Sequence, residues 1–265
     1  MYNDRLRQML TVLAVGVTIA VNALATLLPL NGQTTGAISD RYPVLVTPAG
    51  YVFGIWGLIY LGLVAYVVYQ ALPAQRENPV LRAIAPWFLL SCAANIGWIF
   101  LWHYNLILLT LPMMLALLGS LLLIFARLRR SDQTLAERWL VRAPFSIYAG
   151  WITVATIVNV AVVLYQSGIV IEGPAAALLA AGVLAVGGAI AVGIALRLGD
   201  WLYALVIVWA YIGIGEKQSG APLVVWAAWI LAALVAVAAV VALARGGVPR
   251  KGSPVIDLPP APKRT

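Results

Sequence analysis

The feature that most limits the fold of this chain is a series of long apolar runs with no Asp, Glu, Lys or Arg near the middle. About 20 apolar residues in a helix cross the roughly 30 Å hydrocarbon core of a bilayer, and a helix satisfies its own backbone hydrogen bonds there. The sequence therefore predicts an all-α, polytopic transmembrane helix bundle of about eight spans. The expected spans are residues 9–30, 47–72, 85–103, 105–127, 143–166, 174–197, 200–215 and 222–244.

The composition agrees with a membrane protein and excludes several kinds of site. Of the 265 residues, 63% are hydrophobic and 10% are charged, whereas a soluble domain has about 45–50% and about 25%. The single cysteine, Cys92, excludes an internal disulfide, and a single histidine makes a His-ligated metal site unfavourable. The sequence has no Ser/His/Asp set, no paired buried carboxylates and no phosphate-binding glycine loop. We therefore expect no catalytic residues and no metal site, and we expect that the protein is not an enzyme.

The basic residues are distributed very unevenly over the predicted topology. Only Arg41 and Lys217 fall on one side, and the other 15 of the 17 basic residues fall on the side that holds both termini. Cytoplasmic connections carry such an excess of Lys and Arg. We therefore expect an integral protein of a bacterial inner membrane with both termini in the cytoplasm. This asymmetry accounts for the net charge of +8, so we expect no nucleic-acid partner.

The connection at residues 127–142 carries much of that positive charge. We interpret it as a solvated loop that sets the orientation in the membrane, with contact to anionic membrane lipid as the alternative. Within the spans, no acidic or basic residue lies at the middle, and Asp200 and Glu216 only bracket the short seventh run. Ion-coupled pumps usually need buried ionisable groups. The sequence argues against an ion-driven pump but leaves facilitated movement of a ligand open.

Three of the apolar runs carry aromatic and amide side chains at helical spacing. A helix places residues four apart on one face. Aromatic rings and amides that converge inside an apolar bundle suit a flat, largely apolar ligand with a few polar edges. The three stripes are Phe53, Trp56 and Tyr60; Asn95, Trp98 and Trp102; and Trp151, Ala155 and Asn159.

Each of these residue types also has a plainer interpretation. Asn95 and Asn159 could bond to each other or to nearby backbone and only fix helix packing. Tryptophans often form belts at the membrane interface, which fits Trp226 and Trp229 better than the inner Trp56. His103, at the end of the third span, is either an interfacial residue or a contact to a haem iron or a porphyrin carboxylate.

Three blocks of the sequence resemble the TspO/MBR family, the tryptophan-rich sensory proteins related to the mitochondrial translocator protein. Val52-Phe53-Gly54 followed by Trp56-Gly57-Leu58-Ile59-Tyr60, after Pro48, is similar to the family's second helix. Asn95-Ile-Gly-Trp98-Ile-Phe100 is similar to its third helix. Tyr148-Ala-Gly-Trp151 followed by Ala155-Thr156 and Asn159 is similar to its fifth helix, without a gap from Trp151 to Asn159. The resemblance covers roughly residues 9–168, which is five of the eight predicted helices.

The resemblance implies a five-helix bundle with a pocket between the helices and under the first loop, and many members dimerise. It implies that no cofactor is required and that porphyrin or haem is the ligand. The implied partners are a tetrapyrrole-like small molecule, membrane lipid and a second copy in a homodimer. The contacts it implies fall on Trp56, Tyr60, Asn95, Trp98, Trp151, Ala155 and Asn159; the spacing adds Phe53, with His103 as a further candidate.

The chain differs from the family pattern in several places, among them the proline before the Trp of the second helix, which is missing, and a glutamine of the third helix, where Ser91 stands. Its first loop has no Trp, and Ala49 stands where the family has a second proline. We expect residues 1–168 to form the ligand-binding core, residues 169–245 to form three additional transmembrane helices, and the proline-rich, basic residues 246–265 to be a disordered cytoplasmic tail.

The predicted function is that of a membrane receptor, sensor or carrier for a porphyrin, haem or similar flat ligand. The alternatives are a facilitative membrane transporter and a structural subunit of a larger membrane complex that binds no ligand. Degradation of a porphyrin is a further alternative.

Overall fold

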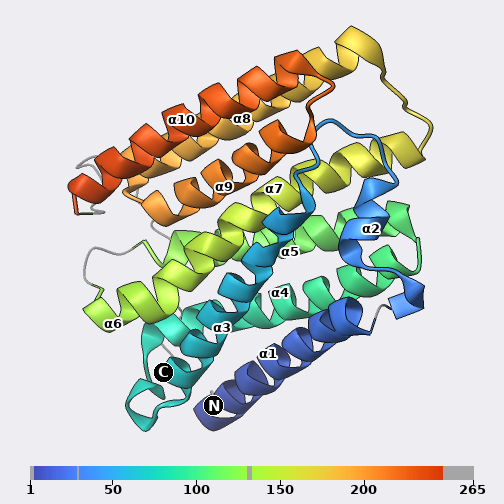
Figure 1. Ribbon diagram of the computed structural model, residues 1–265. Coiled ribbons are helices and arrows are strands. Elements are labelled where there is room, and N and C mark those ends of the chain that lie inside the picture. Colours follow the sequence, from blue (N-terminus) through green and yellow to red (C-terminus); the bar gives the residue numbers. More distant parts are fainter. Residues whose placement is uncertain (1–2, 29, 130–132, 247–265) are drawn as a thin grey trace.

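The computed structural model describes residues 3–28, 30–129 and 133–246, and the regular structure in these residues is entirely helical (Figure 1). The long helices are α1 (Asp4–Leu27), α3 (Ile55–Ala71), α4 (Pro79–His103), α5 (Ile107–Arg127), α7 (Ala143–Gln166), α8 (Gly173–Leu198), α9 (Trp201–Lys217) and α10 (Pro222–Ala244). The short helices are α2 (Thr35–Asp40) and α6 (Leu135–Glu137), with 3-10 turns at Leu30–Gly32, Gly50–Gly54 and Pro73–Gln75 and a π-helical turn at Arg138–Arg142.

The long helices lie side by side in one bundle, and α7 connects its two parts (Figure 1). On one side of α7, α5 packs against α4, and α1 packs against α4 and α3. On the other side α7 contacts α9, and α10 covers both α9 and α8. The last three helices therefore pack on the first five through α7.

The two ends of the bundle differ in what they carry. The arginine-rich end has Arg82, Arg129, Arg138 and Arg142, close to the start of α7 and to the connection between α8 and α9. The opposite end has α2 and the residues that lead into α3 (Figure 1). We call residues 35–54 the lid segment, because they lie over the ends of α4 and α7 at this end of the bundle.

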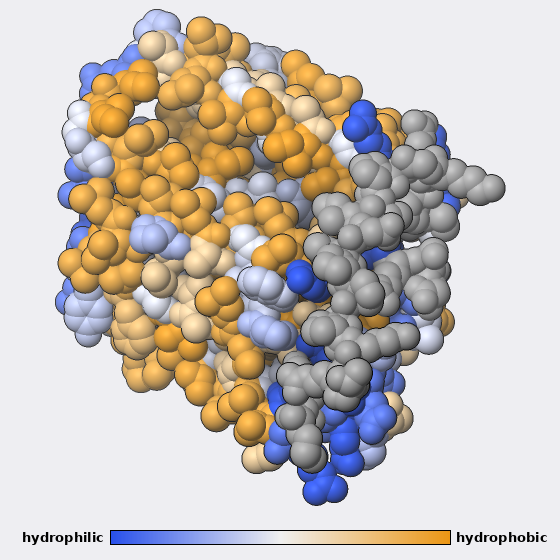
Figure 2. Space-filling model, turned by 180° about the vertical axis from the view of Figure 1, so that it is seen from behind, coloured by the Kyte–Doolittle hydropathy of each residue, from blue (hydrophilic) through white to orange (hydrophobic). Residues whose placement is uncertain are grey.

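The outer surface is that of a membrane protein. Figure 2 shows a broad band of hydrophobic residues with hydrophilic residues at its edges. Among the described residues, seven helical segments are long and apolar enough to cross a membrane. The expected polytopic helical bundle is confirmed, and the chain is an integral membrane protein. The exception to the expected eight spans is α9, whose 17 residues span only about 26 Å.

Several expected helix limits were wrong. α1 runs from Asp4 to Leu27 instead of 9–30, and α4 begins at Pro79 instead of residue 85. Pro48 does not open α3, because the chain first makes a 3-10 turn at Gly50–Gly54 and α3 starts only at Ile55. Of the predicted tail at 246–265, all but Gly246 lies outside the described residues.

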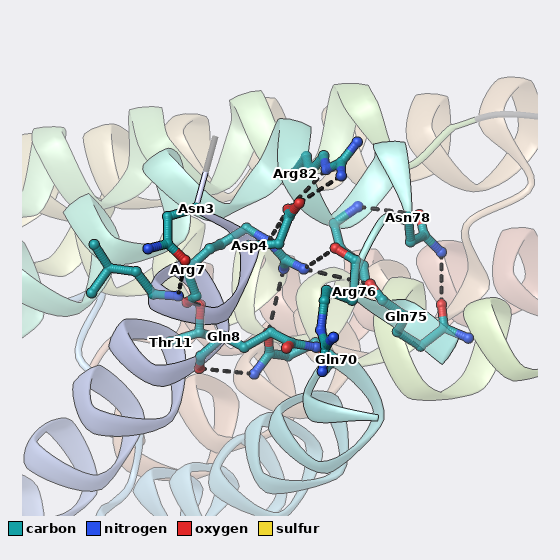
Figure 3. A network of polar contacts seen from close by, with 12 residues as sticks. Asn3, Asp4, Arg7, Gln8, Thr11, Gln70, Gln75, Arg76, Asn78 and Arg82 are labelled. Carbon is teal, nitrogen blue, oxygen red and sulfur yellow. Dashed lines mark hydrogen bonds and ion pairs between the residues drawn. The ribbon is translucent and has the colours of Figure 1, made fainter. Parts of the chain in front are cut away.

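Polar contacts at the arginine-rich end explain the early starts of α1 and α4 (Figure 3). Arg82 donates to both carboxylate oxygens of Asp4, at 2.8 and 2.6 Å. The buried Arg7 donates to the carbonyl oxygen of Arg76 at 3.0 Å, and Gln8 Nε2 donates to that of Gln70 at 2.7 Å. These contacts hold the first turns of α1 against the end of α3 and the connection to α4. The capping residues Asn3 and Asn78 begin α1 and α4 ahead of their apolar runs.

Candidate ligand-binding site

Trp151 is at the centre of an aromatic cluster formed by α3 and α7. Its ring packs edge-on against Phe53, with ring centroids 5.7 Å apart, and against Trp56 at 6.3 Å. Trp56 in turn stacks on Tyr60 at 5.5 Å and meets Tyr148 edge-on at 5.8 Å. Such edge-to-face and offset pairs are favourable arrangements of aromatic rings. The structure therefore brings the first and third predicted stripes, those of Trp56 and Trp151, into direct contact.

Asn95 joins three helices through hydrogen bonds. Its Oδ1 accepts from Asn22 Nδ2 of α1 at 2.7 Å, and its Nδ2 donates to the hydroxyl of Tyr148 in α7 at 3.2 Å. The side chain is buried. The two asparagines of the stripes therefore do not bond to each other, and in this conformation Asn95 fixes the packing of α1, α4 and α7.

Asn159 forms the second bridge, between α7, α4 and α5. Its Oδ1 accepts from Trp98 Nε1 at 3.4 Å, and its Nδ2 donates to Thr110 Oγ1 at 2.8 Å. Trp98 also stacks on Trp102, with ring centroids 5.1 Å apart. The indole of Trp98 is held by the amide of Asn159 and by a neighbouring ring one helical turn away.

A cavity of about 30 Å³ lies between α4, α7 and the lid segment. Its walls include five of the predicted site residues, together with Trp102 and with Thr35, Ser39 and Pro48 of the lid segment. Trp56, Tyr60 and Asn95 do not line it. The five predicted residues in its walls are Phe53, Trp98, Trp151, Ala155 and Asn159.

Two polar atoms of this cavity's wall residues have no partner. Among the described residues, neither the indole Nε1 of Trp151 nor the hydroxyl of Ser39 has a hydrogen-bond partner, although both side chains are about 2% exposed. A buried donor without an acceptor costs about 1–3 kcal/mol. The cavity therefore has two hydrogen-bonding groups, beside an aromatic wall, that no described residue of the protein satisfies.

His103 lies at the end of α4, as expected, but it is fully buried and not exposed at the interface. Its Nδ1 is 2.8 Å from the carbonyl oxygen of Ile99, and its Nε2 is 3.5 Å from Thr35 Oγ1 of the lid segment. The imidazole does not line the cavity. Contact between His103 and a ligand stays a prediction.

No pattern in the sequence predicts the contacts between α9 and the lid segment. Trp209 Nε1 donates to the carbonyl oxygen of Val52 at 3.1 Å, and Gln218 Nε2 donates to that of Thr47 at 3.0 Å. Ala49 N donates to the carbonyl oxygen of Gly213 at 3.0 Å. An ion pair joins Lys217 to Asp40. The helix α9 therefore holds the lid segment in place over the cavity.

A second, larger cavity lies on the other side of the lid segment. It measures about 340 Å³ and is bounded by residues 43–46, the second half of α7 and the first half of α8. Thr156 lines this cavity, whereas its neighbour Ala155 lines the small one. The same stretch of α7 therefore separates the two spaces.

The comparisons with known proteins agree with this architecture. The protein-family model for the TSPO-like protein matches residues 8–241. The chain belongs to the TSPO-like family. The match continues past residue 168 and includes α8, α9 and most of α10. No curated protein and no solved structure matches the chain.

Family membership fixes the general kind of protein. A TSPO-like protein is a membrane protein of the sensing or binding kind, and the family is generally non-enzymatic. Among the described residues, no group of three or more His, Cys, Asp and Glu side chains is placed to hold a metal ion. The chemistry available at the site of this TSPO-like protein is aromatic stacking and hydrogen bonding.

Proposed function

We propose that this protein is a membrane receptor or carrier that binds a flat, largely apolar ligand with polar edges, of the porphyrin or haem class, beneath the lid segment. The observation that carries the proposal is the buried Trp151 Nε1, which has no acceptor among the described residues and belongs to a wall of aromatic rings. A ligand with an acceptor at its edge would satisfy this donor while its face packs against the rings.

The closed cavity is too small for such a ligand. It holds about 30 Å³, whereas pockets for small molecules usually measure about 300–1,000 Å³. Binding therefore requires the lid segment to move away from α4 and α7. The lid segment is tied to α9 by polar contacts and to α4 by the hydrogen bond from Trp102 Nε1 to the carbonyl oxygen of Thr35, and these contacts have to break when it moves.

This arrangement favours a receptor or sensor role. A ligand that displaces the lid segment also changes its contacts with α9, and α9 packs on α10, α8 and α7. Binding beneath the lid segment would thus act on the last three helices through the contacts of α9. A ligand shifts such an equilibrium by its difference in affinity for the open and closed states.

The proposal is tested by titrating the purified protein with protoporphyrin and with haem, following absorbance. Trp151→Phe keeps an aromatic ring but removes the indole N–H, so we expect affinity to fall about three- to tenfold, the effect of one hydrogen bond. The matched control is Trp226→Phe, because Trp226 is 67% exposed on the outer face of α10; we expect no change there.

Each other outcome has a definite meaning. Equal affinity for Trp151→Phe and the parent would show that the ligand binds elsewhere. The absence of saturable binding to the folded parent would overturn the proposal and leave a structural subunit as the better explanation. Ligand flux into vesicles that contain the protein would identify a carrier and not a receptor.

A further inference from the structure

A third cavity, at the arginine-rich end, has a different chemistry from the two near the lid segment. It measures about 210 Å³ and lies where the start of α7 meets the start of α9 and the end of α10. A π-helical turn at Arg138–Arg142 leads into α7, closed by a hydrogen bond from Ala143 N to the carbonyl oxygen of Arg138. Single π-helical turns are frequent at functional sites. This turn places both arginines in the wall of the cavity.

Arg142 is held in position by a buried carboxylate. Its Nη2 is 3.5 Å from Asp200 Oδ2, and Asp200 is 3% exposed. The same Oδ2 accepts from Ser146 Oγ at 2.7 Å, and Oδ1 accepts from the backbone N of Tyr203 at 3.1 Å. Asp200 therefore has its acceptors occupied by the protein and serves to position Arg142.

Asp200 does not balance the positive charge gathered around it. Arg129 Nη2 and Arg142 Nη2 both donate to the carbonyl oxygen of Leu198, at 2.9 and 3.5 Å. Arg129 Nη1 is buried and has no hydrogen-bond partner among the described residues. Burial, and then the nearby charge of Arg142, lower the pKa of Arg129 to about 10. Two guanidinium groups therefore share one carboxylate, and the exposed Arg138 adds a third positive charge.

The carboxylate that adjoins Arg138 in the sequence is already bound elsewhere. Glu137 precedes Arg138, but its Oε1 accepts from Asn78 Nδ2 at 3.0 Å and its Oε2 accepts from Thr134 N at 3.0 Å. It forms the capping box of α6. The cavity thus keeps an excess of positive charge that suits an anion.

The surroundings of the cavity identify the source of that anion. Trp139 is 55% exposed and packs edge-on against Trp201, with ring centroids 6.4 Å apart. Exposed tryptophans at the ends of spanning helices lie at the level of lipid headgroups. Leu135, Leu202 and Leu243 give the same cavity an apolar wall. Arginines, interfacial tryptophans and leucines together match a phosphate joined to acyl chains, and basic pockets between spanning helices bind such headgroups.

We propose that this cavity is a binding site for the phosphate headgroup of an anionic membrane lipid, contacted by Arg138 and Arg142 and flanked by Trp139 and Trp201. The site is independent of the ligand site under the lid segment, which lies at the opposite end of the bundle. A bound lipid would also join α7 to α9 and α10.

The test is native mass spectrometry of the full chain in mild detergent with added phosphatidylglycerol or phosphatidylcholine. Arg138→Gln removes one exposed charge that does not support the fold. One basic residue near a membrane surface contributes about fivefold in affinity for anionic lipid, so we expect that loss for phosphatidylglycerol. The matched control is Arg5→Gln, an exposed arginine at the same end but outside the cavity. It should retain phosphatidylglycerol as the parent does, with unchanged melting temperatures in both variants.

Three results would overturn the proposal. Equal retention of phosphatidylglycerol and phosphatidylcholine by the parent would show that no anionic site exists. An equal loss in Arg138→Gln and Arg5→Gln would show a general charge effect. Binding of millimolar inorganic phosphate by a parent protein that retains no phosphatidylglycerol would show that the site takes free phosphate and not a lipid. Protoporphyrin titration of Arg138→Gln separates this test from the proposed function, because that affinity should not change.

Discussion

At the scale of single residues, the buried amides have structural roles in the closed conformation. Asn95 hydrogen-bonds to Asn22 and Tyr148 across three helices. We predict that Tyr148→Phe, which removes only one of these bonds, lowers the free energy of unfolding by about 1 kcal/mol, because hydrogen bonds between membrane helices contribute about 0.6–2 kcal/mol. Thermal unfolding in detergent measures this change.

The control for Tyr148→Phe is Leu90→Ala on α4, the helix that also carries Asn95. Leu90 is 44% exposed on the outer face of α4, so its truncation leaves no internal cavity and should change stability little in detergent. A melting temperature for Tyr148→Phe equal to that of the parent would show that the contact between Asn95 and Tyr148 contributes nothing to packing.

The sequence predicted these residues as a group but not their partners. Helical spacing is enough to place Trp151, Ala155 and Asn159 on one face, and the structure brings that face against α4 and the lid segment. Thr110, which accepts a hydrogen bond from Asn159, and Ser39, which lines the cavity, stand in no recognisable pattern. Their roles depend on how α5 and α2 pack, and spacing within one helix does not determine that.

At the scale of elements, the close approach of α9 to the lid segment is the main finding. A Cβ added at Gly213 would overlap Cγ2 of Val52 and reach 3.4 Å from Pro48 Cβ. We predict that Gly213→Ala pushes the lid segment away from α9. It should lower the free energy of unfolding by about 1–3 kcal/mol, the usual effect of overpacking, and speed the association of protoporphyrin. Stopped-flow absorbance and thermal unfolding measure the two effects.

A matched glycine substitution and a compensating change make this prediction specific. Gly182 on α8 has nothing within 4 Å of an added Cβ, so Gly182→Ala should leave stability unchanged or raise it by up to about 1 kcal/mol. Adding Val52→Ala to Gly213→Ala should restore part of the lost stability, since it removes the overlapping methyl groups. Equal effects of the two glycine substitutions would contradict the close contact.

The order and type of the elements could be predicted better than their ends. Eight apolar runs correspond to eight long helices among the described residues. The start of α1 has a local signal in Asn3, which caps the helix by accepting from Leu6 N at 3.1 Å. The contact of Asp4 with Arg82 could not be predicted, because Arg82 lies far along the chain. The contact of α9 with the lid segment also could not be predicted, since it joins residues more than 150 positions apart.

At the scale of the whole molecule, the uneven distribution of basic residues between the two ends of the bundle predicts the topology in the membrane. If α9 crosses the membrane despite its 17 residues, both termini are cytoplasmic and the connection between α9 and α10 is outside. We predict that a membrane-impermeant maleimide added to intact cells labels Ser219→Cys but neither Arg5→Cys nor Arg245→Cys. All three positions are exposed, and the native Cys92 is buried.

Permeabilised cells are the control, because all three variants should then be labelled. Labelling of Arg245→Cys in intact cells, without labelling of Ser219→Cys, would show that α9 does not cross. The bundle would then have seven spans, as the helix lengths alone suggest.

The central claim is that the ligand enters beneath the lid segment, and tethering that segment tests it most directly. Asp40 and Lys217 form an ion pair between the lid segment and α9. Asp40→Cys and Lys217→Cys in one chain, joined by a short bis-maleimide linker, would hold the lid closed. We predict that the linked protein loses saturable protoporphyrin binding, while each single variant treated with the same reagent binds as the parent does. Unchanged affinity in the linked protein would contradict the claim.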